Sequence, residues 1–159
     1  LFAAYGVTDP KLQEECLRSW GEFARMEIPP LFEGAKETLL QLGKRGLTLH
    51  IWTARDKDST LALLEHHRIL NCFASISCCS QFSSKPDAES LNWDFKLKTP
   101  RSLLMIGDSA TDMKAAKNIG AIAGVASWDP YLDEPVLLAA GAELHFDKPE
   151  SVLDYLGVQ

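Results

Sequence analysis

Apolar positions in the first part of the chain recur at helical spacing. Thr8 and Asp9 supply a capping side chain before Pro10, which is a typical start of a helix. Apolar residues then return every three or four positions as far as Met26, which predicts an amphipathic helix over 10–26. The pair Pro29-Pro30 breaks the pattern and is the one plausible hinge between domains. A second helix is predicted over 35–44.

From residue 47 onward, short apolar runs alternate with amphipathic segments. Strands that alternate with helices imply right-handed crossovers and a parallel sheet. Continuous apolar strands are typical of a sheet that is covered by helices on both faces. The pattern therefore predicts an α/β fold with a Rossmann-like parallel sheet. The predicted strands are 47–53, 72–77, 102–106, 121–126 and 143–146, and the predicted helices are 59–68, 88–95, 111–119, 134–140 and 150–156.

Composition and charge narrow the class of protein. Acidic residues outnumber basic ones, 22 to 16, and no basic block occurs, so we expect no nucleic-acid partner. No apolar run reaches the roughly 18 residues of a membrane-spanning helix, so we expect no membrane partner. The four cysteines form no C-x-x-C pair, and the chain starts without the pattern of a signal peptide. These features favour a cytoplasmic protein with reduced thiols, and they leave its oligomeric state open.

Polar residues follow three of the predicted strands. In a doubly wound sheet, ligands bind beyond the carboxyl ends of the strands. Thr53 follows LTLHIW, Lys85 comes after the second predicted strand, and Asp108 follows LLMIG. Trp128, after the strand 121–126, could border the same site or belong to a structural turn.

The pair Asp108 and Asp112 is the strongest candidate for a metal site. Gly107 would allow a tight turn after the strand, and a spacing of four would bring both carboxylates to one side of a helix start. Two carboxylates suit Mg²⁺, which keeps some water and takes a phosphate oxygen as a further ligand. The alternative is that Asp108 or Ser109 only caps the helix while Asp112 interacts with its dipole.

The other polar residues could hold a phosphate. Thr53 could donate its hydroxyl, with the backbone N–H groups of Ala54 and Arg55 nearby, or it could only satisfy local backbone groups. Arg55 could reach a substrate anion or form an exposed ion pair. Lys85 could neutralise phosphate charge or simply be solvated.

The order and spacing of these signals resemble the haloacid dehalogenase-like hydrolases. LTLHIWT, ending at Thr53, is similar to the second motif of that family, and Lys85-Pro86 is similar to the third. GDSATD, from Gly107 to Asp112, is similar to the fourth motif, G-D-x-x-x-D. The segments before and after these motifs resemble the phosphoglycolate-phosphatase-like group, which has a helical cap.

The resemblance implies a magnesium-dependent phosphatase that acts on a small phosphorylated metabolite through an aspartyl-phosphate intermediate. It also implies two parts: residues 1–29 would be a remnant of the helical cap, and residues 30–159 the α/β core without its first strand. The implied catalytic residues are Thr53 and Lys85, the implied substrate-binding residues are Thr53, Ala54, Arg55 and Lys85, and the implied Mg²⁺ ligands are Asp108 and Asp112.

The family's first motif, D-x-D-x-T at the end of the first strand, has no counterpart before the first predicted helix. The letters recur at Asp56–Thr60, but Asp56 falls three residues after the strand that ends at Thr53, so we expect no nucleophile there. In the family the missing strand lies between those that carry Thr53 and Asp108 here. Without it, buried N–H and C=O groups would lack partners, at about 1–3 kcal/mol each.

We therefore expect an N-terminal segment beyond this sequence that carries the first strand and its aspartates. The chain alone should then have no phosphatase activity. Direct pairing of the Thr53 strand with the Asp108 strand would contradict this expectation. Two other readings stand beside it: a non-catalytic relative that binds a phosphate ligand or a protein partner, and a receiver-type or flavodoxin-like module. The last explains neither Lys85-Pro86 nor the order of the motifs.

Overall fold

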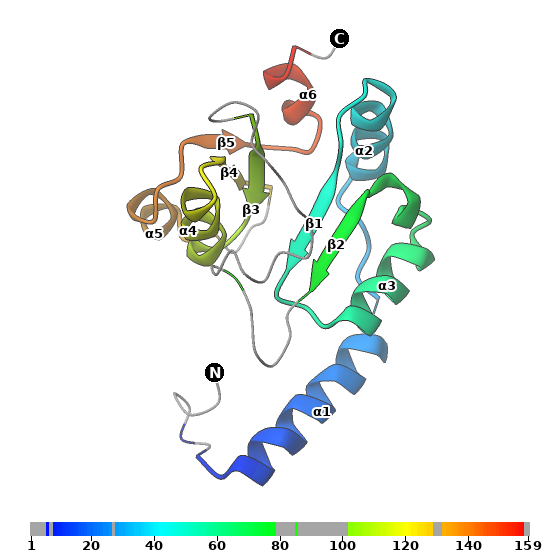
Figure 1. Ribbon diagram of the computed structural model, residues 1–159, viewed down its shortest axis with the longest axis vertical. Helices are drawn as coiled ribbons and strands as arrows, with labels where there is room; N and C mark the ends of the chain where they lie inside the picture. The colour runs from blue at the N-terminus through cyan, green and yellow to red at the C-terminus, as the bar shows by residue number, and fades with distance from the viewer. Residues whose placement is uncertain are drawn as a thin grey trace.

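The computed structural model describes residues 6, 8–26, 28–78, 85, 102–128 and 132–157 (Figure 1). Helices and strands alternate over residues 50–78 and again from residue 104 onward, as predicted. The elements in chain order are α1 (Pro10–Met26), α2 (Ala35–Lys44), β1 (His50–Thr53), α3 (Lys57–His66), the 3-10 turn η2 (Leu70–Cys72), β2 (Ser75–Cys78), β3 (Leu104–Gly107), α4 (Ala110–Asn118), β4 (Ile122–Ala126), α5 (Glu134–Ala139), β5 (Leu144–Phe146) and α6 (Ser151–Tyr155).

Some of the predicted helices and strands have the predicted bounds in the structure, and others have shifted ends. The helices predicted over 10–26 and 35–44 have the predicted bounds. α3 begins two residues early, at Lys57, because the Asp56 side chain caps it by accepting a hydrogen bond from the Ser59 N–H at 3.0 Å. β2 begins at Ser75 because the 3-10 turn occupies the start of the predicted strand. The helix predicted over 88–95 lies outside the described residues.

The strands are parallel, as predicted. β1 pairs with β2, and β3, β4 and β5 form a separate ladder in that order. Among the described strands, β1 and β3 do not pair with each other. Direct pairing of these two strands would have contradicted the expectation of a further strand between them, and it is not observed.

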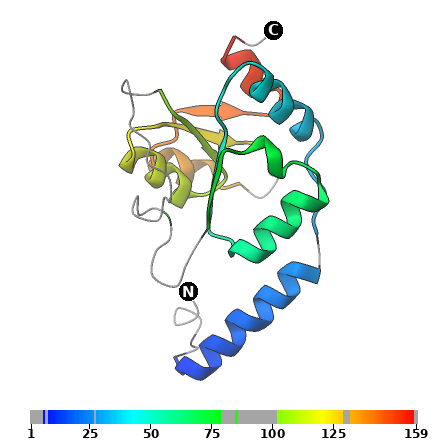
Figure 2. The same cartoon turned by 45° about the vertical axis from the view of Figure 1, so that its right-hand side comes forward.

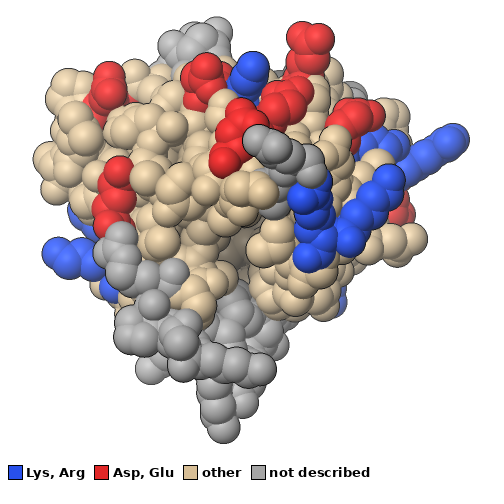
Figure 3. Space-filling view, turned by 90° about the horizontal axis from the view of Figure 1, so that it is seen from above, with Lys and Arg blue, Asp and Glu red and all other residues tan. Residues whose placement is uncertain are grey.

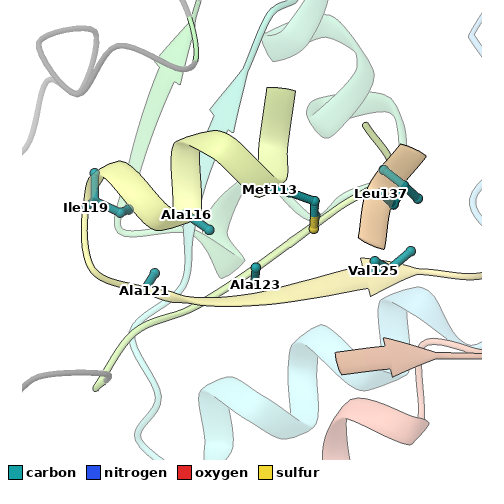
Figure 4. Close-up of a cluster of buried hydrophobic side chains, with 7 residues drawn as sticks. All are labelled: Met113, Ala116, Ile119, Ala121, Ala123, Val125 and Leu137. Carbon is teal, nitrogen blue, oxygen red and sulfur yellow. The ribbon is translucent and has the colours of Figure 1, made fainter. Parts of the chain in front are cut away.

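Helices cover both faces of the three-stranded sheet. Along β3, Met105 packs toward α4 and α5, whereas Leu104 and Ile106 pack toward α2 and α6. This alternation follows from the pleat, which sends successive side chains to opposite faces. Figure 4 shows the cluster on the first face, where α4 and α5 meet β4. Its buried members are Met113, Ala116, Ile119, Ala121, Ala123, Val125 and Leu137.

Side chains connect the two sheets where backbone hydrogen bonds do not. Trp52 on β1 packs against the cluster of α4 and β4, and Leu49, just before β1, packs against the cluster of α2 and α6. The apolar clusters on both faces of the larger sheet therefore extend to residues on or next to β1. The two sheets share one apolar core even though no described ladder joins β1 to β3.

The first helix, α1, lies beside α3 and extends away from the sheets (Figure 2). No helix among the described residues combines the length and the apolar character needed to cross a bilayer. Figure 3 shows one face of the molecule, on which acidic side chains lie mainly in the upper part of the view and basic side chains lie mainly toward both sides, in places next to acidic ones.

We predict that Gly124→Ala destabilises the fold. A methyl group at this position on β4 would lie 2.7 Å from Cε2 of Phe146, a buried ring of the second cluster. Overpacking of this kind costs about 1–3 kcal/mol of the free energy of unfolding, measured by urea denaturation. Gly43→Ala is the control, because a methyl group on Gly43 in α2 meets nothing within 4 Å, and alanine there should stabilise by about 0.5–1 kcal/mol. Equal effects of the two substitutions would contradict the packing argument.

Candidate phosphate and metal site

The turn from β3 to α4 is organised around the carboxylate of Asp112. Oδ2 of Asp112 accepts hydrogen bonds from the Asp108 N–H at 3.2 Å, the Ser109 N–H at 3.1 Å and the Ser109 hydroxyl at 2.7 Å. Ser109 is the N-cap of α4, and its Oγ accepts from the Asp112 N–H at 3.2 Å. This reciprocal arrangement is a capping box, which satisfies N–H groups that a helix start leaves without partners.

Gly107 makes room for that carboxylate. A Cβ atom at position 107 would lie 2.4 Å from both Cβ and Cγ of Asp112. Gly107 is not among the glycines with positive φ, so the tight turn that the sequence suggested is not the reason for a glycine here. The reason is the close approach of the Asp112 side chain to the end of β3.

Lys85 is paired with the second oxygen of Asp112. Its Nζ forms an ion pair with Oδ1, and the two side chains are 12% and 5% exposed. Burial alone would raise the pKa of Asp112, but hydrogen bonds from Lys85 and Ser109 and the positive charge of Lys85 outweigh it. The pKa of Asp112 therefore lies below the ordinary value of an aspartate.

The two carboxylates of the fourth motif differ in accessibility. Asp112 is buried, with 3% of the whole residue exposed, and its oxygens already accept several hydrogen bonds. Asp108, in contrast, is exposed at the end of β3. Asp108 can thus meet a metal ion directly, while Asp112 could meet one through water or by giving up Lys85. Within the described ranges, no three His, Cys, Asp or Glu residues gather as a complete ligand set. Two carboxylates completed by water and a phosphate oxygen fit Mg²⁺.

A cavity of about 280 Å³ opens at the carboxyl ends of β3 and β4. Its polar part contains Lys85 from one segment of the chain, and Asp108 and Asp112 from the turn between β3 and α4. Its apolar part includes two aromatic side chains, Phe32 and Trp128. The remaining lining residues are Ile106, Gly107 and Ala126.

The predicted residues after β1 lie apart from this cavity. Thr53, Ala54 and Arg55 are not among its lining residues. Oγ1 of Thr53 accepts a hydrogen bond from the Arg55 N–H at 3.1 Å, which is the local alternative that the sequence left open. The hydroxyl proton of Thr53 can still be donated, because this bond uses only the oxygen as acceptor. The structure thus brings together three of the six predicted residues.

The sequence did not single out Phe32. Its signal would have been an aromatic residue directly after the Pro29-Pro30 hinge, but an isolated Phe in that position is equally compatible with packing. Trp128, which the sequence placed either at the border of the site or in a turn, lines the cavity.

The chain resembles known proteins over most of its length. Residues 1–125 match the family described as haloacid dehalogenase-like hydrolase. The phosphoglycolate phosphatase of Vibrio cholerae is 29% identical over 154 residues, which cover 93% of this chain and 65% of that protein. The phosphoglycolate phosphatase of Synechococcus elongatus is 27% identical over 123 residues, covering 77% of this chain and 58% of that protein.

Solved structures share the fold. YfnB of Bacillus subtilis, described as a HAD-hydrolase and solved bound to magnesium, superimposes with a TM-score of 0.72 at 19% identity, covering 98% of this chain and 67% of that one. A HAD-superfamily hydrolase of Geobacter sulfurreducens gives a TM-score of 0.66 at 21% identity, covering 93% and 74%. These structures show that the fold is shared, and the family match over residues 1–125 shows that the chain belongs to the haloacid dehalogenase-like hydrolases. It spans less than two thirds of the curated relatives it matches.

We predict that Gly107→Ala displaces the Asp112 carboxylate. The added methyl group overlaps Cβ and Cγ of Asp112, so hydrogen bonds to Asp108 and Ser109 should break. The free energy of unfolding should fall by about 1–3 kcal/mol, measured by urea denaturation. In an Asp112→Gly background the same substitution should cost much less, since the overlapping atoms are gone. An equal cost in both backgrounds would contradict this origin of the effect.

We also predict that Lys85→Met makes stability depend on pH in a new way. In the wild type the lowered pKa of Asp112 stabilises the fold above about pH 4, and this contribution is lost as the pH falls through the lowered value. Without Lys85 the buried carboxylate loses that support, so at pH 7 the variant should be less stable by about 1–3 kcal/mol. The deficit should shrink as the pH falls below about 4, through the lowered pKa of Asp112.

Urea denaturation at several pH values, in buffer containing a metal chelator, measures this difference. Lys114→Met is the matched control, because Lys114 is an exposed lysine on the neighbouring helix α4. It should change stability little at any pH. A Lys85→Met deficit that stays constant as the pH falls from 7 to about 3 would show that the pair with Asp112 does not cause it.

Proposed function

We propose that this chain forms the metal- and phosphate-binding part of a magnesium-dependent phosphatase that acts on a small phosphomonoester. The observation that carries the proposal is the meeting of Lys85, Asp108 and Asp112 in one cavity at the carboxyl ends of the strands. A cation and two carboxylates at this place are the groups needed to hold a phosphoryl group and Mg²⁺. The names of the phosphoglycolate phosphatases that resemble the chain support a small phosphorylated metabolite as substrate.

Each residue has a distinct part in this proposal. Lys85 neutralises negative charge on the phosphoryl oxygens, and Asp112 positions its ammonium group through their ion pair. The exposed Asp108 carboxylate is the direct ligand for Mg²⁺, with Asp112 behind it. When bound, Mg²⁺ would screen the phosphoryl charge and orient it for in-line attack.

Residues after β1 complete the phosphate site. The Thr53 hydroxyl and the N–H groups of Ala54 and Arg55 can donate to phosphoryl oxygens that lie between the ends of β1 and β3. These residues do not line the present cavity, so this part of the proposal requires a substrate that extends to the end of β1.

The nucleophile of the proposed reaction comes from outside this sequence. An aspartate carboxylate attacks phosphorus, the alcohol leaves with a proton from a second acid, and water then cleaves the aspartyl-phosphate. Asp56, in the D-x-D-x-T letters of this chain, is the N-cap of α3 and is bonded to Ser59. A further strand between β1 and β3, which do not pair with each other among the described strands, would end between Thr53 and Asp108, where a nucleophile is needed.

The proposal also covers organisation and location. Residues 1–29 belong to the cap and residues 30–159 to the core of a cytoplasmic enzyme, and the chain alone is inactive. The second candidate is a non-catalytic relative that binds a phosphate ligand or a protein partner. The use of Asp56 as a helix cap is compatible with both candidates, because neither takes its nucleophile from Asp56.

We predict that Asp108→Asn lowers the turnover of the complete gene product. Amide oxygen is a weaker ligand for Mg²⁺ than carboxylate, so kcat with small phosphomonoesters should fall at least about ten-fold and more Mg²⁺ should be needed. Phosphate release at a series of Mg²⁺ concentrations measures both effects. Asp58→Asn, at an exposed aspartate in the first turn of α3, is the matched control and should leave kcat unchanged.

The same assay separates the two candidate functions. Turnover by the complete gene product, with none by residues 1–159 alone, is the expected result. Turnover by residues 1–159 alone would contradict an external nucleophile. No turnover by either protein, with phosphate still bound, would favour the non-catalytic relative.

A further inference from the structure

We propose that Phe32 and Trp128 form a wall that contacts the organic part of the phosphoester, so that the site prefers esters whose alcohol carries an apolar or aromatic face. This inference rests on the proposed function and adds the substrate class. We call these two side chains the aromatic wall.

The aromatic wall joins two segments that are far apart in the sequence. Phe32 precedes α2, and Trp128 lies two residues after the end of β4. Their rings meet edge to face, with centroids 6.3 Å apart and planes inclined by 62°. Both rings line the cavity that contains Lys85, Asp108 and Asp112. One cavity thus has a charged part and an aromatic part.

Exposure of the aromatic wall indicates that it is available to a ligand. Phe32 is 50% exposed, although burial of a phenyl ring is favourable, and Trp128 is half-buried. Small-molecule sites commonly combine apolar and aromatic walls with a few polar groups that fix orientation. With the phosphoryl group held by Lys85, the alcohol part of the ester would extend toward the rings.

The segment that carries Phe32 is held in place. The Phe32 carbonyl accepts a hydrogen bond from the Ala35 N–H at 3.1 Å, and Nε2 of His67 lies 2.8 Å from the Pro29 carbonyl. Gly34 has a φ of 74°, and the Glu150 carboxylate fills the space where its Cβ would be. A fixed ring loses little entropy when a ligand packs against it.

The test compares two esters in the complete gene product. Benzyl phosphate and ethyl phosphate both release a primary alcohol, but only the first has an aromatic ring. In Phe32→Ala and in Trp128→Ala, the KM for benzyl phosphate should rise about three- to ten-fold. The kinetic constants for ethyl phosphate should stay within about two-fold of the wild type. Trp128→Phe should retain most of the preference for the benzyl ester.

Controls separate this inference from its alternatives. Leu138→Ala removes a side chain that is 53% exposed on α5 and outside the cavity lining, and it should change neither ester. Equal losses on both esters, with a lower thermal midpoint, would mean that the aromatic wall is covered by another segment of the protein, and would overturn the inference while the proposed function stands. Absence of magnesium-dependent turnover of both esters by the wild type would overturn the proposed function and this inference with it.

Discussion

The carboxylate of Asp112 is the point on which the site depends. It receives the backbone N–H groups of Asp108 and Ser109, closes the capping box of α4 and holds Lys85, a residue from a distant part of the chain. It can occupy this place only because position 107 has no side chain. One buried acid therefore fixes the end of β3, the start of α4 and the ammonium group of Lys85 relative to one another.

A second constraint comes from the two sheets. Each is parallel and has helices packed against it, but among the described strands β1 and β3 do not pair with each other. The apolar clusters nevertheless continue from one sheet to the other through Trp52 and Leu49. This combination, a shared core with no described ladder between β1 and β3, is why we place the proposed nucleophile on a further strand instead of on a loop of this chain.

Much of the fold was predictable from the sequence, and the site only in part. Apolar periodicity predicted α1 and α2 with their observed bounds, and an apolar run followed by G-D-x-x-x-D located the turn at Asp112. The pairing of Lys85 with Asp112 was not predictable, because it depends on contact between distant segments. The steric reason for Gly107 and the meeting of Phe32 with Trp128 depend in the same way on tertiary structure. The two separate ladders agree with the expectation that the Thr53 and Asp108 strands are not neighbours, an expectation that came from the family resemblance because strand periodicity alone does not reveal which strands pair.

The central claim is that this turn, with Lys85 beside it, holds Mg²⁺ and a phosphoryl group. A crystal structure of the complete gene product with Mg²⁺ and a phosphate analogue tests it most directly. We predict an Asp108 oxygen at about 2.0–2.1 Å from the metal, the anion in contact with Lys85, and Asp112 still bonded to the Ser109 N–H. A metal ion bound away from Asp108, or an anion bound outside the cavity at the end of β3, would contradict the claim.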